Sequence, residues 1–251
     1  MNDERLNPPD AKTLAYRALC LGALITRAEL ETAFRDNPGP GIDESLKRMI
    51  DSVGDWLAGT GLGRQLSDEE GRLLAKPAGS WSEEEASEAA WRTEALSALL
   101  WALGVAEAAP RYDAEFADAK ALERLGLMKP IDGFLRRAGL RPPEEIARER
   151  EVAALWDLRA KIERIVREMP EVQPPGGQTF PEVVVLMVRQ AYAEGLIAQT
   201  VEDDLPAFGK PYRQLSEEEL RRATNIASER LHALNWLRSQ AEDWDATPAD
   251  A

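Results

Sequence analysis

The chain has 251 residues, of which 44% are hydrophobic and 30% are charged, so it can bury one substantial core. Its 45 acidic and 31 basic residues give a net charge of -14, which disfavours nucleic-acid binding because phosphate backbones are also negative. A single cysteine excludes an intramolecular disulfide, and with only one histidine a zinc site is not expected.

The beginning of the chain shows no targeting or membrane signal. Residues Met1 to Arg5 are polar or charged, and Arg17 interrupts the longest apolar run that follows. We therefore expect a cytoplasmic protein that does not bind a membrane. The single thiol, Cys20, lies between two leucines, which is typical of a buried small hydrophobe rather than a nucleophile.

Apolar residues recur at helical spacing along most of the chain, and the alternation typical of strands is scarce. Even the β-branched run Val183 to Val185 belongs to a segment with helical spacing. We predict about ten helices, with boundary errors of about two to four residues. In chain order they cover 10–22, 27–35, 43–57, 68–75, 83–103, 115–125, 130–138, 143–168, 181–195 and 217–241.

Helix starts are marked by capping boxes, in which a hydroxyl residue is followed three positions later by glutamate. They occur at Thr26, Ser67, Ser82 and Ser216, and Gly104 is placed to end the helix before it.

Proline and glycine interrupt the helical pattern at 37–41 and at 170–181. The second break is a proline- and glycine-rich loop. We predict one all-α globular domain over 1–251, with polar ends at 1–9 and 246–251.

Four of the predicted helices place an arginine inside an apolar face. A helix turns by about 100° per residue, which puts Arg230 near the centre of the apolar stripe of the last helix. Arg17, Arg92 and Arg159 share apolar faces of their own helices in the same way. A buried guanidinium stays charged, so it needs hydrogen-bond acceptors nearby.

Two alternatives supply those acceptors. In the first, the protein supplies them: carboxylates on neighbouring helices, with Glu94 and Glu151 as candidates, form buried ion pairs that fix helix register, or backbone carbonyls at helix ends accept the hydrogen bonds. In the second, Arg92, Arg159 and Arg230 converge on a pocket for a phosphate or carboxylate. The chain has enough acidic residues to pair its own arginines, which favours the first alternative.

Other candidate chemistry is weak. His232 has no identifiable partner for acid–base catalysis, and the glycine pair in Gly61 to Gly63 follows a helix and is no dinucleotide-binding loop. We expect no cofactor and no metal. Trp244 is followed by a polar tail, which makes it a candidate exposed anchor for a partner, the alternative being a place in a tryptophan-rich core.

Three stretches resemble the bacterial domain of unknown function 4272. They are Trp91-Arg92-Thr93-Glu94-Ala95-Leu96 with Leu99 to Gly104, Arg141 to Ile146 leading to Ala154 to Arg159, and Glu229 to Leu237 with Asp243-Trp244-Asp245. The resemblance covers about residues 10 to 250, although the Asp-Thr that usually closes the family is replaced here by Asp250-Ala251. It implies a mostly helical fold and no established activity. Arg92, Arg159 and Arg230 all match the family pattern.

These observations lead to two hypotheses on function. The first is a non-catalytic interaction protein, of an inhibitor or immunity type, whose acidic surface suits a basic protein partner. The second is an anion-binding protein or enzyme. Its ligand-binding residues would be Arg92, Glu94, Arg159, Glu229 and Arg230, with the two glutamates as acid or base groups.

Overall fold

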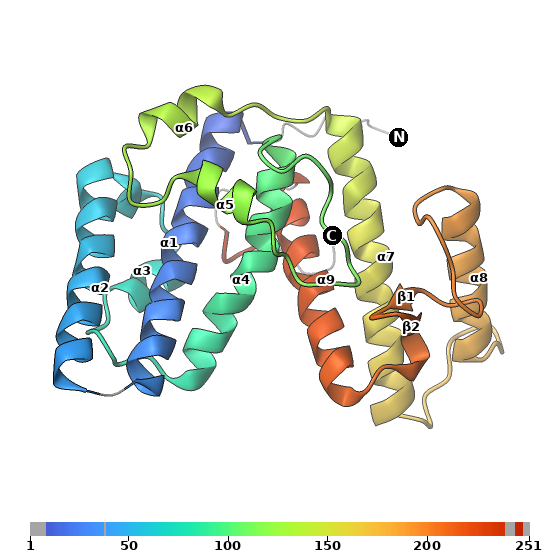
Figure 1. Cartoon of the computed structure of the whole chain (residues 1–251). Coiled ribbons are helices and arrows are strands. Elements are labelled where there is room, and N and C mark those ends of the chain that lie inside the picture. The colour runs from blue at the N-terminus through green and yellow to red at the C-terminus, as the bar shows by residue number, and fades with distance from the viewer. Residues whose placement is uncertain (1–8, 38, 239–243, 248–251) are drawn as a thin grey trace.

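A computed structural model describes residues 9–37, 39–238 and 244–247 (Figure 1). Within these ranges the protein is all-α apart from one small hairpin, as predicted. The helices are α1 (Ala11–Asp36), α2 (Pro40–Thr60), α3 (Asp68–Leu74), α4 (Glu83–Ala102), α5 (Ala119–Leu125), α6 (Asp132–Arg137), α7 (Pro143–Glu168), α8 (Phe180–Ala193) and α9 (Glu217–Arg238). Strands β1 (Pro206–Ala207) and β2 (Lys210–Pro211) pair antiparallel through a turn at Phe208 and Gly209.

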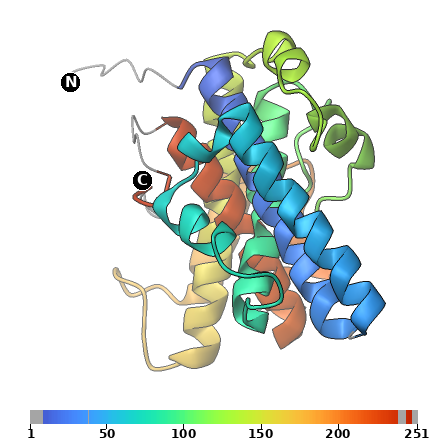
Figure 2. The same ribbon diagram turned by 90° about the vertical axis from the view of Figure 1, so that its left-hand side faces the viewer.

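The six longest helices lie side by side in the order α2, α1, α4, α9, α7, α8 (Figure 1). Helix α6 crosses one end of the row, and α5 lies below it, between α1 and α4 in this view. Figure 2, in which the α2 side faces the viewer, shows α1 and α2 in front of the later long helices. The buried apolar side chains form one large cluster that includes Leu14 of α1, Leu99 of α4 and Leu234 of α9. Residues on both sides of the 170–181 loop therefore share a core.

Helix α1 is continuous, so the prediction of separate helices over 10–22 and 27–35 was wrong. Thr26 does not cap a second helix, because its hydroxyl donates to the backbone carbonyl of Gly22, one turn earlier, at 2.8 Å. Most side chains from Leu19 to Leu30, a stretch that includes both predicted helix ends, are buried against neighbouring helices. Tertiary packing therefore carries the helix through a local start signal.

The other predicted capping boxes, at Ser67, Ser82 and Ser216, form both of their hydrogen bonds. A further box at Thr179 begins α8 and was not anticipated. Gly104 follows α4 with a φ of 67°, a left-handed conformation that suits glycine. The predicted stretch 239–241 of the last helix and most of the predicted polar ends lie outside the described residues.

Candidate functional site

Helices α4 and α9 are joined by two reciprocal ion pairs. Arg92 Nη1 on α4 donates to both carboxylate oxygens of Glu229 on α9, at 2.9 and 3.0 Å. In the opposite direction, Arg230 on α9 donates to Glu94 Oε2 on α4, at 3.0 Å from Nε and 2.5 Å from Nη2. Because each helix supplies one cation and one carboxylate, the two pairs fix the register of α4 against α9.

The inner pair, Arg230 with Glu94, also holds the loop that follows α4. Arg230 Nη1 donates to the carbonyl of Arg111 at 2.7 Å, and Nη2 donates to the carbonyl of Ala114 at 3.3 Å. Glu94 Oε1 accepts the backbone N–H of Phe116 at 2.9 Å. Arg230 is 0% exposed, so its charge is compensated by these protein groups rather than by water.

A tyrosine in the same loop connects this cluster to α7. Tyr112 stacks on Trp156, with ring centroids 5.6 Å apart, and donates its hydroxyl to Glu149 Oε1 at 3.0 Å. Burial raises the pKa of Glu149 to about 7, although the Tyr112 hydroxyl and the charge of Arg230 act to lower it. Glu149 therefore titrates near neutral pH inside the folded protein.

Arg159 on α7 lies in a different cluster. Its Nε and Nη2 donate to the two carboxylate oxygens of Asp204 at 2.8 and 2.9 Å, and its Nη1 donates to Glu163 at 2.9 Å. The guanidinium lies over the Tyr212 ring, 4.7 Å from its centroid. Burial acts to raise the pKa of Asp204, but the hydrogen bonds and charge of Arg159 hold that pKa below its usual value. This cluster ties α7 to the segment that leads into β1.

Of the five residues predicted to bind a ligand, four thus form two ion pairs between α4 and α9, and the fifth, Arg159, lies in a separate cluster with Asp204 and Glu163. Arg92, Arg159 and Arg230 line three separate hollows, and each binds a carboxylate of the protein. Glu94 is one of the acceptors, as predicted, whereas Glu151 is exposed on α7 and forms no ion pair within the described residues. This geometry favours structural ion pairs, and ligand binding by the five residues stays a prediction.

Arg17, the fourth inward arginine, forms a buried ion pair with Glu70. Glu70 also completes the capping box of α3 by accepting the backbone N–H of Ser67 at 2.9 Å. The sequence identified Glu70 only as a capping residue, because a local motif contains no information about a partner 53 positions away. Cys20, one turn further along α1, is fully buried, as predicted.

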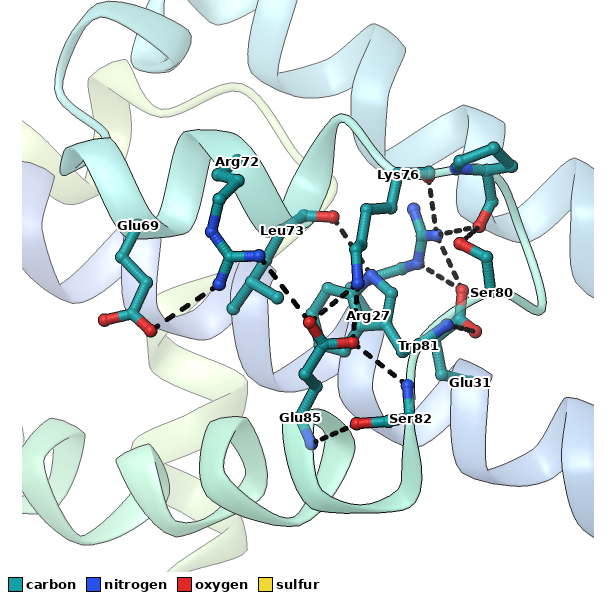
Figure 3. A network of polar contacts seen from close by, with 11 residues as sticks. Arg27, Glu31, Glu69, Arg72, Leu73, Lys76, Ser80, Trp81, Ser82 and Glu85 are labelled. Atoms are coloured by element: carbon teal, nitrogen blue, oxygen red, sulfur yellow. Dashed lines mark hydrogen bonds and ion pairs between the residues drawn. The ribbon is translucent and has the colours of Figure 1, made fainter.

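A fifth buried arginine, Arg27, was missed because a helix start was predicted next to it. Its Nε donates to Glu31 at 2.8 Å, and its Nη2 donates to the carbonyl of Lys76 at 2.9 Å (Figure 3). Glu31 in turn accepts the backbone N–H groups of Gly79 and Trp81. The spacing of Arg27 and Glu31, four residues apart, was the available signal. The network attaches the loop between α3 and α4 to α1.

Trp244 is buried, so the hypothesis of an exposed aromatic anchor was wrong. Its ring lies edge-on to His232 at 4.5 Å and to Trp236 at 5.5 Å, and the Arg17 guanidinium lies 5.2 Å from its centroid. Burial, followed by the charge of Arg92, lowers the pKa of His232 to about 4. His232 is therefore neutral at pH 7 and packs as an aromatic ring.

Two mainly apolar hollows are lined by residues of α8 and of the segments beside it. One, of about 440 Å³, lies between α7 and α8 and is lined by Ile162, Val166 and Val184 among others. The other, of about 500 Å³, shares Pro181 and Val185 with it. We call the two together the α8 groove.

Within the described part of the chain, no group of three or more histidine, cysteine, aspartate or glutamate side chains is placed to hold a metal ion. No described helix is both long and apolar enough to cross a membrane.

In a comparison with known families, residues 2–177 match a family described as "Domain of unknown function (DUF4272)". The matched stretch contains Arg92, Glu94 and Arg159, whereas Glu229 and Arg230 lie beyond its end. The similarity that we noted in the closing motif is therefore not part of the match. No curated protein and no solved structure matches the chain.

Proposed function

The chain belongs to the DUF4272 family, and we propose that it is a non-catalytic member that binds an apolar, basic segment of a partner protein in the α8 groove. An inhibitor or immunity-type role is one form of this function. The observation that carries the proposal is the apolar surface left uncovered around α8.

Helix α8 lies at the edge of the row, next to α7, and no described helix lies on its outer side (Figure 1). Leu186 on this helix is 55% exposed, and Val166 on α7 is also exposed. Isolated exposed apolar residues are ordinary, but these two border connected hollows that are themselves mainly apolar. A continuous surface of this kind is typical of a protein-binding site.

The charges around the groove support a basic partner. Five carboxylates line the two hollows, those of Glu163, Glu182, Glu202, Asp203 and Asp204, against the two guanidiniums of Arg159 and Arg213. A partner that brings lysine or arginine beside its apolar side chains would offset this excess of negative charge. The net charge of -14 for the chain acts in the same direction at longer range.

The residues that the sequence predicted to form a site are already bound to one another, which supports a function without catalysis. Arg92 is bound to Glu229 and Arg230 is bound to Glu94, so these groups already neutralise one another. An acid, base or anion-binding role would require one of these ion pairs to open first. No such requirement applies to the α8 groove.

Selection of a displayed random-peptide library against the protein tests this proposal. We expect the enriched peptides to combine apolar residues with lysine or arginine, and to lose at least tenfold in affinity for Val166→Glu and Leu186→Glu. Leu122→Glu on α5 is the matched control, because Leu122 is 37% exposed, Val166 is 38% exposed, and α5 is not part of the groove. No enrichment, enriched peptides without basic residues, or equal losses for the control would refute it.

A further inference from the structure

A second apolar pocket lies between the start of α7 and the end of α9. Its volume is about 230 Å³, and its apolar walls include Ile146 of α7 together with Leu234 and Leu237 of α9. These three side chains are buried and belong to the main core, so the pocket is a built feature of the helix interface. We call it the α7/α9 pocket. It uses the opposite end of α7 from the α8 groove and is independent of the proposed partner binding.

Two arginines that line this pocket have no carboxylate partner within the part of the chain that the structure describes. Arg150 is half-buried and donates only its Nε, to Asn235 Oδ1 at 2.8 Å, and neither it nor Arg238 forms an ion pair with any described residue. They differ in this from the buried or half-buried arginines of the ion-pair clusters, which are Arg17, Arg27, Arg92, Arg159 and Arg230.

The two guanidiniums also act on each other. Burial, followed by the positive charge of Arg238, lowers the pKa of Arg150. Glu151, which also lines the pocket, offsets this in part but does not reach ion-pair distance of either arginine. Two neighbouring arginines to which no described carboxylate is paired, in a chain with 45 acidic residues, leave room for an anion from outside.

Size and charge define the ligand. An apolar cavity of about 150 Å³ holds benzene, so a pocket of this kind with about 230 Å³ takes an apolar body of about six to eight carbon atoms. Arg150, Arg238 and Glu151 together contribute a net charge of +1, which matches one carboxylate better than two.

We propose that the α7/α9 pocket binds a small monocarboxylic acid with an apolar body, such as a medium-chain fatty acid or an arylalkanoic acid. The carboxylate lies between Arg150 and Arg238, and the apolar body lies against Ile146, Leu234 and Leu237. The charged head and the apolar walls act together, so neither an uncharged body nor a bare carboxylate is sufficient.

Isothermal titration calorimetry of the full chain with octanoate and phenylbutyrate tests the proposal. Octanol supplies the same apolar body as octanoate without the charge, acetate supplies the charge without the body, and suberate adds a second carboxylate. We expect one octanoate or phenylbutyrate per chain and at least tenfold weaker binding of the other three. Methyl NMR of Ile146, Leu234 and Leu237 reports where the ligand lies.

Variants separate a ligand site from a structural role. Arg238→Met is expected to weaken octanoate binding at least tenfold without loss of stability, because Arg238 is exposed and forms no ion pair with a described residue. Arg150→Lys, which keeps a donor towards Asn235, is expected to weaken binding less than Arg150→Met. Arg164→Met is the matched control, since Arg164 is an exposed arginine on α7 that does not line the pocket.

Three results would overturn the proposal. They are no binding of either acid at millimolar concentration, equal binding of octanoate and octanol, and equal binding by wild type and Arg238→Met. A peptide with a C-terminal leucine distinguishes a second source of the same chemistry. If it binds more tightly than octanoate, and amidation of its C-terminus abolishes binding, the pocket belongs to a peptide carboxylate and the assignment to a small acid is wrong.

Discussion

The Arg230 and Glu94 pair allows a quantitative test of how the buried arginines stabilise the fold. Arg230→Met removes a guanidinium that is 0% exposed and leaves the Glu94 carboxylate with the Phe116 amide as its remaining described donor. Removal of one partner of a buried ion pair costs about 3–5 kcal/mol, because the other charge stays buried and unpaired. We expect a loss of unfolding free energy in this range.

Arg92→Met is the matched comparison, because it breaks the reciprocal pair on the same two helices. The Arg92 side chain is 28% exposed and that of Glu229 is 16% exposed, so water solvates the charge left behind. A loss of about 1–2 kcal/mol is expected. Both ion pairs join the same two helices, so the difference between the two losses of unfolding free energy measures the effect of burial.

Urea denaturation followed by circular dichroism measures both losses, and the slope of the transition shows whether the unfolded states remain comparable. The double variant Arg230→Met with Glu94→Leu is expected to recover part of the loss, since it leaves no buried charge unpaired. Hydrogen exchange at the Phe116 amide is expected to accelerate in Arg230→Met and not in Arg92→Met. Equal losses for the two single variants, or strict additivity in the double variant, would refute the reasoning.

Three further predictions concern the backbone, pH dependence and thiol reactivity. Gly79→Ala is expected to destabilise the protein by about 2–4 kcal/mol in thermal or urea unfolding, because Gly79 has a φ of +75° and an added Cβ would lie 2.6 Å from the Phe34 ring. Gly61→Ala is the control, with the same φ and nothing within 4 Å of the added Cβ, and is expected to lose about 1–2 kcal/mol. A larger loss for Gly61→Ala than for Gly79→Ala would contradict the argument. The pKa of Glu149 is raised from 4.5 to about 7, so the folded state favours the protonated form and this group's contribution, about 3 kcal/mol, is present below pH 4.5 and lost as pH rises through 7. Relative to wild type, Glu149→Gln is therefore expected to gain stability across that window, and a flat difference between the two unfolding curves would show that Glu149 does not titrate there. Finally, burial raises the pKa of the Cys20 thiol to about 12, so a thiol reagent at neutral pH is expected to react only after unfolding, and rapid labelling of the native protein would contradict the buried position.

The sequence was most informative where the relevant physics is local. Capping boxes at Ser67, Ser82 and Ser216 marked real helix starts, because their hydrogen bonds span three residues. Helical spacing also placed Arg17, Arg92, Arg159 and Arg230 on inward faces, since the wheel depends only on the helix itself. The same reasoning failed at Thr26, where packing of α1 outweighs the local signal.

The sequence by itself determined the all-α class, most helix starts and the inward arginines, and the tertiary structure decided which groups meet. A helical wheel reports a face but not the neighbour that the face meets, so Glu94 as the partner of Arg230, 136 positions away, could be named only as a candidate. Asp204 reaches Arg159 from a loop with no helical period to analyse. The absence of a carboxylate partner for Arg150 and Arg238 among the described residues is likewise a property of packing, because any of the chain's many acidic residues could have been their neighbour.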